Sequence, residues 1–242
     1  MQINFQIFDD PAETSRAVAE LIKEKTQIIS DSEFLNIAVS GGSTPRLLFE
    51  LLGEEYETSV NWKKVRLFWV DERCVEPTNP ESNYGMTYDA FLQRTFVPGD
   101  NIFRIHGEEI PEYEADRYQK LLLKELPAKN GFPVFDLILL GMGEDGHTAS
   151  IFPNDLSLLD TDVSVAVNTN PYTGQKRITL TGNTITNALQ TVFLVTGESK
   201  SGKLLEIRND EKVAEKYPVW HICNQSNNQS FYIDSAAASL IK

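Results

Sequence analysis

One glycine-rich loop constrains this chain more than any other feature. The loop runs from Gly141 to Ser150 and contains Asp145 and His147. It follows an apolar run, residues 135–140, that is typical of a buried strand. In open α/β sheets, ligands bind at the carboxyl ends of the strands. Because histidine is the side chain that titrates near neutral pH, His147 is a candidate base; the alternative is a histidine that only hydrogen-bonds within a tight turn.

Segments typical of strands and of helices alternate along most of the chain. The expected strands are 3–8, 35–39, 65–70, 102–105, 134–140, 191–195 and 231–233. The expected helices are 11–29, 45–52, 84–95, 111–126, 183–189, 200–208 and 235–240. This alternation predicts an α/β fold with a mostly parallel sheet and helices on both faces. Two further segments, 164–167 and 177–181, bracket a turn and predict some antiparallel pairing.

No linker or internal repeat divides the sequence. We therefore expect a single domain over residues 1–242, which is long enough to bury a large core. Two cysteines, Cys74 and Cys223, form no disulfide framework, and we expect Cys74 to be a buried or partly buried free thiol. The first residues lack the basic and apolar regions of a signal peptide, so a reducing, cytoplasmic location is expected.

Composition narrows the classes of partner. The formal net charge is −13, which disfavours nucleic acid, because a phosphate backbone needs a basic surface. A small phosphorylated ligand needs only a few local cations and backbone N–H groups, and it stays compatible with this charge. No apolar stretch approaches the length of a transmembrane helix, so no membrane partner is expected. The sequence does not specify an oligomeric state.

A second candidate loop follows the strand at 35–39. It reads Ser40-Gly41-Gly42-Ser43-Thr44 and leads into a helix. Glycines allow close approach of a ligand, and the first N–H groups of a helix favour an anion. We expect this helix to begin at Pro45, with Thr44 as its cap. The alternative to anion binding is an ordinary strand-to-helix turn in which Thr44 only caps the helix.

Charged residues mark two more strand ends and one strand start. Asp71-Glu72-Arg73 follows the strand at 65–70. Asp71 is a candidate base or sugar ligand, and Arg73 is a candidate for polarising a carbonyl or holding a phosphate. The alternative is a local ion pair between them. Arg177 begins a strand and Lys200 begins a helix, where the helix dipole disfavours a cation. Each is a candidate anion ligand, with a solvated surface charge as the alternative.

The four polar loops share one place in a parallel sheet. Strand ends of the same polarity meet at one edge, so we expect Ser40–Thr44, Asp71–Arg73, Gly141–Ser150 and Gly197–Lys200 to converge. Metal binding has little support, because the histidines and cysteines show no paired spacing. The loops match neither a phosphate-binding Walker motif nor a Gly-x-Ser-x-Gly elbow.

At these same residues the chain resembles the 6-phosphogluconolactonase family, along nearly its whole length. The matching motifs are Ser40–Pro45, Asp71–Val75 with Ser82–Tyr84, Gly141–Pro153 and Lys176–Thr181. The resemblance implies a modified Rossmann-like, three-layer α/β/α fold. It also implies hydrolysis of 6-phospho-D-glucono-1,5-lactone to 6-phospho-D-gluconate in the oxidative pentose phosphate pathway. It implies no cofactor and no metal, and a phosphorylated sugar lactone as the partner.

The resemblance assigns roles residue by residue. His147 would activate water. Phosphate would be held by Gly41, Gly42, Ser43, Thr44, Arg177 and Lys200. Asp71 and Arg73 would line the lactone end. Apart from the resemblance, Asp145 is a candidate for holding the ring of His147 or binding substrate, because it lies two residues away. The sequence leaves open whether Asp71 or Asn83 reads the sugar hydroxyls.

One departure separates this chain from the deaminases of the same superfamily. Glucosamine-6-phosphate deaminases resemble the pattern Asp-Gly-His-x-Ala-Phe-Asn-Glu-Pro, in which the Glu serves the catalytic His. Here Phe152 stands in place of that Glu. They also have Asp-Glu-Tyr where this chain has Asp71-Glu72-Arg73. The sequence therefore favours hydrolysis, with a deaminase or isomerase, or a non-catalytic sugar-phosphate sensor, as the alternatives.

Overall fold

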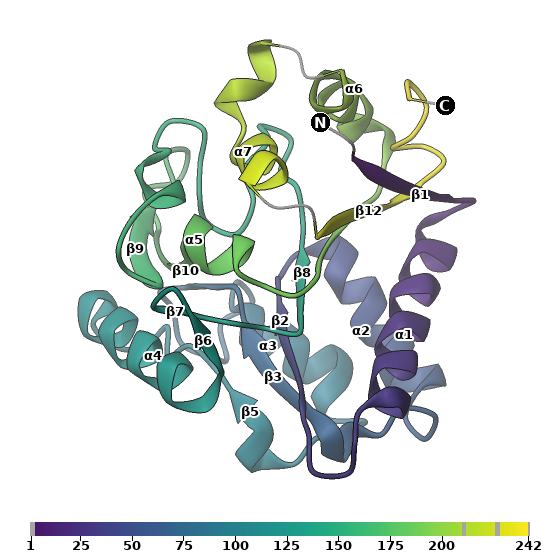
Figure 1. The fold of residues 1–242 in the computed structure, drawn as a ribbon, viewed down its shortest axis with the longest axis vertical. Helices are drawn as coiled ribbons and strands as arrows, with labels where there is room; N and C mark the ends of the chain where they lie inside the picture. Colours follow the sequence, from purple (N-terminus) through teal and green to yellow (C-terminus); the bar gives the residue numbers. More distant parts are fainter. Residues whose placement is uncertain (1–2, 210–211, 226–227, 242) are drawn as a thin grey trace.

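A seven-stranded parallel sheet forms the centre of the molecule (Figure 1). The computed structural model describes residues 3–209, 212–225 and 228–241. The strand order is β1-β12-β11-β8-β2-β3-β5, and every neighbouring pair is parallel. The strands are β1 Asn4–Phe8, β2 Leu35–Val39, β3 Val65–Trp69, β5 Ile102–Phe103, β8 Leu137–Leu140, β11 Thr191–Val195 and β12 Gln229–Asp234. The predicted α/β fold with a mostly parallel sheet is confirmed.

The middle strands read as apolar runs because both of their faces are covered. Every residue of β8 and of β11 is buried. Aromatic rings join neighbouring strands: Phe193 stacks on Phe231 at 4.6 Å between ring centres, and Phe68 stacks on Phe103 at the same distance. The rigid sheet that results holds the strand-end loops in fixed relative positions.

Helices lie on both sides of the sheet. Figure 1 shows α1 (Pro11–Ile28) and α2 (Ser43–Glu55) on one side and α4 (Pro111–Glu125), α5 (Gly182–Thr186) and α7 (Pro218–Gln225) on the other. The remaining helices are α3 Asn83–Thr87, which continues into a π-helical turn at Tyr88–Leu92, and α6 Ser201–Arg208. Among the described residues, no helix combines the length and apolarity needed to cross a membrane.

Helix α1 begins where the sequence predicts. The carboxylate of Asp10 accepts a hydrogen bond from the backbone N–H of Glu13 at 2.8 Å, and Pro11 occupies the first helical position. An acidic cap satisfies an N–H that has no partner inside the helix, and proline has no N–H there to satisfy. Residues 3–8 were expected to form an edge strand, and β1 lies at the edge of the sheet.

A second sheet is antiparallel, and its first strand follows directly after β3 in the chain. It has the order β4-β10-β9, with β4 at Asp71–Arg73, β9 at Val165–Thr169 and β10 at Lys176–Leu180. The sequence predicted β9 and β10 but not β4, which is too short to show a period. A two-stranded pair, β6 Ala128–Lys129 with β7 Phe132–Pro133, was also not predicted.

Near the carboxyl terminus one helix prediction is wrong and one helix was not predicted. The segment 235–240 forms consecutive turns rather than a helix, and Asp234 holds the first of them by accepting the N–H of Ala237 at 2.8 Å. A segment this short cannot offset the cost of helix nucleation without a packed face. Helix α7 was missed, although Val219, Ile222 and Cys223 follow Pro218 at helical spacing and are buried.

Candidate active site

A polar cavity of about 400 Å³ lies at the carboxyl ends of the central strands. All four predicted loops contribute to it: Ser40–Thr44, Asp71 and Arg73, the loop that contains His147, and Lys200. Asn83 and Arg177 complete the predicted set. Of the eleven site residues predicted from the sequence, only Asp145 does not line the cavity. It lies directly behind His147, in contact with its ring.

His147 and Asp145 form a hydrogen-bonded pair. The ring Nδ1 lies 2.6 Å from Asp145 Oδ1, which also accepts the backbone N–H of His147 at 3.0 Å. Burial alone would raise the pKa of Asp145, but these hydrogen bonds and one from Tyr172 outweigh it and hold that pKa well below its usual value. Because the ionised carboxylate only accepts, Nδ1 carries the ring proton, and Nε2 is left as the acceptor.

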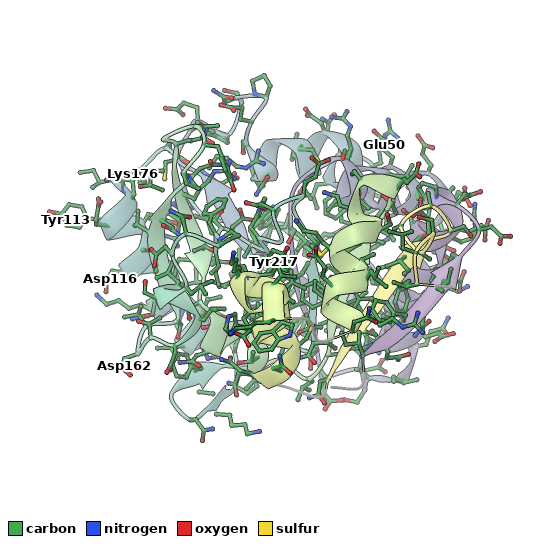
Figure 2. All side chains as sticks on the ribbon, turned by 90° about the horizontal axis from the view of Figure 1, so that it is seen from above. Glu50, Tyr113, Asp116, Asp162, Lys176 and Tyr217 are labelled. Carbon is green, nitrogen blue, oxygen red and sulfur yellow. The ribbon has the colours of Figure 1, made fainter. Side chains whose placement is uncertain are left out.

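The loop around His147 requires glycine at two positions. A Cβ on Gly143 would lie 2.1 Å from Nδ1 of His147. Gly146 has a φ of +84°, and a Cβ there would lie 2.6 Å from the ring of Tyr217, which appears near the middle of Figure 2. Ala149 also has a positive φ of 52°, an uncommon conformation for a residue with a Cβ. The loop is therefore shaped around the imidazole.

The amino terminus of α2 opens onto the same cavity. Gly42 is the residue before the helix and has a φ of +115°, and no side chain caps the helix. The first intrahelical bond runs from the N–H of Arg46 to the oxygen of Gly42, so the N–H groups of Ser43 and Thr44 precede it. The first turn carries no acidic residue. These features suit an anion at this end of the helix.

The expectation that Thr44 caps α2 is wrong. Its hydroxyl instead hydrogen-bonds Thr196 at 2.9 Å, which ties the start of α2 to the end of β11. The helix also begins at Ser43 rather than at Pro45. Because Thr44 makes this hydrogen bond, the N–H groups in the first turn of α2 have no capping side chain from α2 itself.

Gly41 makes room for Asn83. A Cβ at Gly41 would lie 1.7 Å from Asn83 Oδ1. The amide nitrogen of Asn83 donates to the backbone oxygen of Asp71 at 2.9 Å. The loop after β2 and the start of α3 thereby come together at the wall of the cavity.

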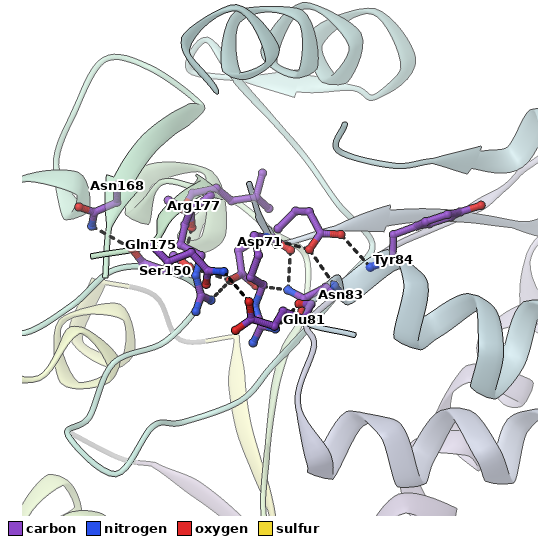
Figure 3. Close-up of polar contacts among 12 residues, drawn as sticks. Asp71, Glu81, Asn83, Tyr84, Ser150, Asn168, Gln175 and Arg177 are labelled. Carbon is purple, nitrogen blue, oxygen red and sulfur yellow. Dashed lines mark hydrogen bonds and ion pairs between the residues drawn. The ribbon is translucent and has the colours of Figure 1, made fainter. Parts of the chain in front are cut away.

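Asp71 is engaged mainly by other protein groups (Figure 3). Its side chain is buried, and Oδ2 accepts the hydroxyl of Ser150 at 2.7 Å. Asn83 lies 3.3 Å from Oδ1, and a guanidinium nitrogen of Arg177 lies 3.8 Å from Oδ2. These contacts favour a role in holding Asn83 and Arg177 over a role as the base.

Three cations line the cavity. Arg73 and Arg177 face each other across the β4–β10 pair, and the Nε atom of each is buried without a hydrogen-bond partner. Like charges placed opposite each other repel, and a bound anion relieves that repulsion. Burial lowers the pKa of Arg177 and of Lys200, although nearby carboxylates oppose the shift in both. Partly desolvated cations of this kind suit a phosphorylated ligand.

Sequence reasoning missed several residues that shape the site. Glu72 is buried and accepts hydrogen bonds from the N–H groups of Arg73, Asn83 and Tyr84 at 2.7–2.8 Å and from a serine hydroxyl at 3.0 Å. Burial raises the pKa of Glu72, and these hydrogen bonds oppose it. The other missed residues are Tyr172, which contacts Asp145, and Thr196, which contacts Thr44. Nothing in their local sequence distinguishes them from ordinary turn residues, since their contacts are long-range.

The arrangement can hold an anion at one end and activate water at the other. His147 supplies a proton acceptor, and the start of α2 with the three cations supplies positive potential. Among the described residues, no group of three or more His, Cys, Asp or Glu side chains is placed to hold a metal ion.

Comparison with known proteins places the chain among its relatives. The profile of the family described as glucosamine-6-phosphate isomerases/6-phosphogluconolactonase matches residues 9–232. A 6-phosphogluconolactonase of Treponema pallidum is 40% identical over 221 residues, which cover 91% of this chain and 90% of the relative. One of Haemophilus influenzae is 40% identical over 208 residues, covering 86% and 88%. The crystal structure of 6-phosphogluconolactonase from Leishmania guyanensis matches all of both chains with a TM-score of 0.88 at 26% identity. The chain belongs to the glucosamine-6-phosphate isomerase/6-phosphogluconolactonase family.

Proposed function

We propose that this protein hydrolyses 6-phospho-D-glucono-1,5-lactone to 6-phospho-D-gluconate, in the oxidative pentose phosphate pathway. The observation that carries the proposal is the cavity in which His147, oriented by Asp145, shares a wall with the start of α2 and with Lys200. The names of the relatives at 40% identity support the same reaction. The free thiols of Cys74 and Cys223 suit a cytoplasmic setting.

In the proposed reaction His147 acts as the general base. Its Nε2 takes a proton from a water molecule as the water oxygen bonds to C1 of the lactone. The resulting tetrahedral intermediate collapses with cleavage of the bond from C1 to the ring oxygen. The imidazolium returns the proton to that oxygen, which becomes the C5 hydroxyl. General base catalysis typically contributes about 10²- to 10⁴-fold.

The phosphate group is held at the start of α2. Gly41, Gly42, Ser43 and Thr44 offer backbone N–H groups and hydroxyls, and Lys200 adds a charge. Fixing the phosphate places C1 near His147, which lowers the entropic cost of the attack.

The other predicted site residues bind the lactone group and the sugar hydroxyls. Arg73 and Arg177 line the same cavity, where a guanidinium would stabilise negative charge on the intermediate. Asp71 and Asn83 sit beside them, and Asn83 is the better placed to read a sugar hydroxyl because Asp71 is occupied by protein donors.

Phe152 argues against amine chemistry at this site. Its ring centre lies 5.0 Å from that of His147, at the position where the deaminase pattern has a carboxylate. The phenyl ring of Phe152 cannot accept or relay a proton.

Two assays on the same preparation test the proposal. Lactone is generated fresh and its hydrolysis is followed by a coupled assay, with correction for spontaneous opening; glucosamine 6-phosphate is incubated separately and ammonia is measured. We expect lactone turnover and no ammonia. Ammonia without lactonase activity would make the protein a deaminase, and tight lactone binding without turnover would make it a sensor.

A further inference from the structure

The turn between β9 and β10 presents one tyrosine to the active-site loop. Asn170 shapes this turn: its Oδ1 accepts the N–H of Tyr172 at 2.9 Å and of Thr173 at 3.2 Å. Gly174 has a φ of +72° and donates its N–H to the oxygen of Asn170 at 2.9 Å. The turn is therefore held in one shape by its own backbone, and the direction of Tyr172 is set with it.

The strands that carry this turn are attached on two sides of the cavity (Figure 3). The amide of Asn168 donates to the backbone oxygen of Ser150 at 2.9 Å, at the end of the His147 loop. Just before the other strand, β10, Gln175 donates to a carboxylate oxygen of Glu81 at 3.1 Å, on the loop that follows β4. These contacts fix the turn relative to both loops.

Tyr172 reaches the carboxylate of Asp145, which contacts the imidazole. Although 69% of the residue is exposed, its hydroxyl lies 2.8 Å from Asp145 Oδ2. The other oxygen, Oδ1, accepts from the ring and the backbone of His147. Both oxygens of Asp145 are thus engaged, one by His147 and one by Tyr172.

We propose that Tyr172 is a positioning residue that acts on His147 through Asp145. The proposal rests on the proposed function only in taking His147 as the base. The hydroxyl fixes the plane of the carboxylate, and the carboxylate in turn fixes the ring. The same hydrogen bond draws negative charge toward Oδ2, so less of it acts on the imidazole at Oδ1.

The charged groups around the pair are few. Lys200, in the turn before α6, interacts electrostatically with Asp145 and with Glu144 of the same loop, and Phe152 packs against the ring of His147. The hydrogen bond to Asp145 raises the pKa of Tyr172, so the hydroxyl remains a donor at neutral pH.

The decisive variant is Tyr172→Phe, which removes only the hydroxyl. With it gone, more of the carboxylate charge favours the protonated ring. Because the base must be neutral to act, the acid limb of kcat/KM moves to higher pH, by roughly half a unit. We expect kcat to fall about three- to tenfold while KM is unchanged; this is less than a buried hydrogen bond to a charged group contributes, because this one is exposed to solvent.

Two matched control variants distinguish an effect on His147 from a general effect of losing a hydroxyl group. Thr173→Ala removes a hydroxyl from the same turn that bonds only its own backbone. Tyr113→Phe removes an exposed tyrosine hydroxyl from α4, at the periphery of the molecule in Figure 2. Neither contacts Asp145, so both should keep the wild-type pH profile.

A second readout does not depend on turnover. The chain has three histidines, so the ring resonances in an NMR titration are few, and the His147→Asn variant assigns the one at issue. In Tyr172→Phe the midpoint of that titration should move upward in the free protein. A midpoint and an acid limb identical to the wild type would overturn the proposal. A shifted midpoint in a protein without lactone turnover would keep it and remove the proposed function instead.

Discussion

At the scale of single residues, the sequence pointed to the imidazole but not to what surrounds it. His147 was identified because it lies in a glycine-rich loop after a buried strand, and the structure places it on the cavity wall. Its contact with Asp145, two residues away, follows from a local turn and was left open. Tyr172 lies 25 residues after His147 in the chain, and no local pattern predicts its contact with Asp145.

Asp145→Asn tests the charge behind the ring. The asparagine oxygen can still accept from Nδ1, so the ring orientation is kept while the negative charge is lost. The imidazolium formed during catalysis is then less stable. We expect the acid limb of kcat/KM to move to lower pH by roughly one unit or more, opposite to the shift for Tyr172→Phe. At neutral pH, kcat should fall about ten- to a hundredfold, because the base is weaker.

Glu144→Gln is the control for that variant. It removes a carboxylate from the same loop that makes no hydrogen bond to His147, so the acid limb should stay in place. If both variants shift the acid limb equally, the effect comes from the negative charge of the loop as a whole and not from the contact between Asp145 and His147.

At the scale of elements, the sequence predicted the strand–loop–helix units well and their ends less well. The loop at Ser40–Thr44 and helix α2 appear where expected because β2 is a buried apolar run with glycines after it. The cap was misjudged since Thr44 finds Thr196, a partner 152 residues away. Strand β4 was missed for the same reason: its pairing with β10 is non-local.

The anion-binding elements can be tested by comparing two substrates. Lys200→Met should raise KM for the phosphorylated lactone at least about tenfold, the loss expected for one charge-assisted hydrogen bond. KM for unphosphorylated gluconolactone should not change. Lys203→Met, three residues further on in α6, is the matched control and should affect neither substrate.

The same comparison decides the role of Arg177. If Arg177 binds phosphate, Arg177→Met raises KM for the phosphorylated lactone more than for gluconolactone. Equal losses with both substrates would assign it to the lactone end, beside Arg73.

At the scale of the whole molecule, the order of the parallel strands explains why distant motifs meet. β2, β8 and β11 are neighbours in the sheet although they are far apart in sequence, and their carboxyl ends carry the three loops that supply most of the cavity. The parallel sheet was predictable from alternating apolar runs and helices. The strand order was not worked out from those runs, because it depends on packing between helices and strands. The cavity concentrates three cations in a chain with a net charge of −13.

This concentration of positive charge predicts that an anionic product stabilises the fold. At a hundredfold excess over its Kd, a ligand adds about 2.7 kcal/mol to the free energy of unfolding. For a chain of this size, that raises Tm by about 5–10 °C. We expect this rise with 6-phosphogluconate in a thermal unfolding experiment. Gluconate at the same concentration should give little change, and an equal rise with both would refute a phosphate site.

The proposed mechanism depends most on the imidazole of His147 as the base, and His147→Asn tests this role directly. The amide nitrogen of asparagine can replace Nδ1 in the bond to Asp145, so the change removes chiefly Nε2. The measurement is kcat for 6-phospho-D-glucono-1,5-lactone, corrected for spontaneous opening, with Tm as a check on folding. We predict a loss of about a hundredfold or more with Tm nearly unchanged. Turnover close to that of the wild type would contradict the account.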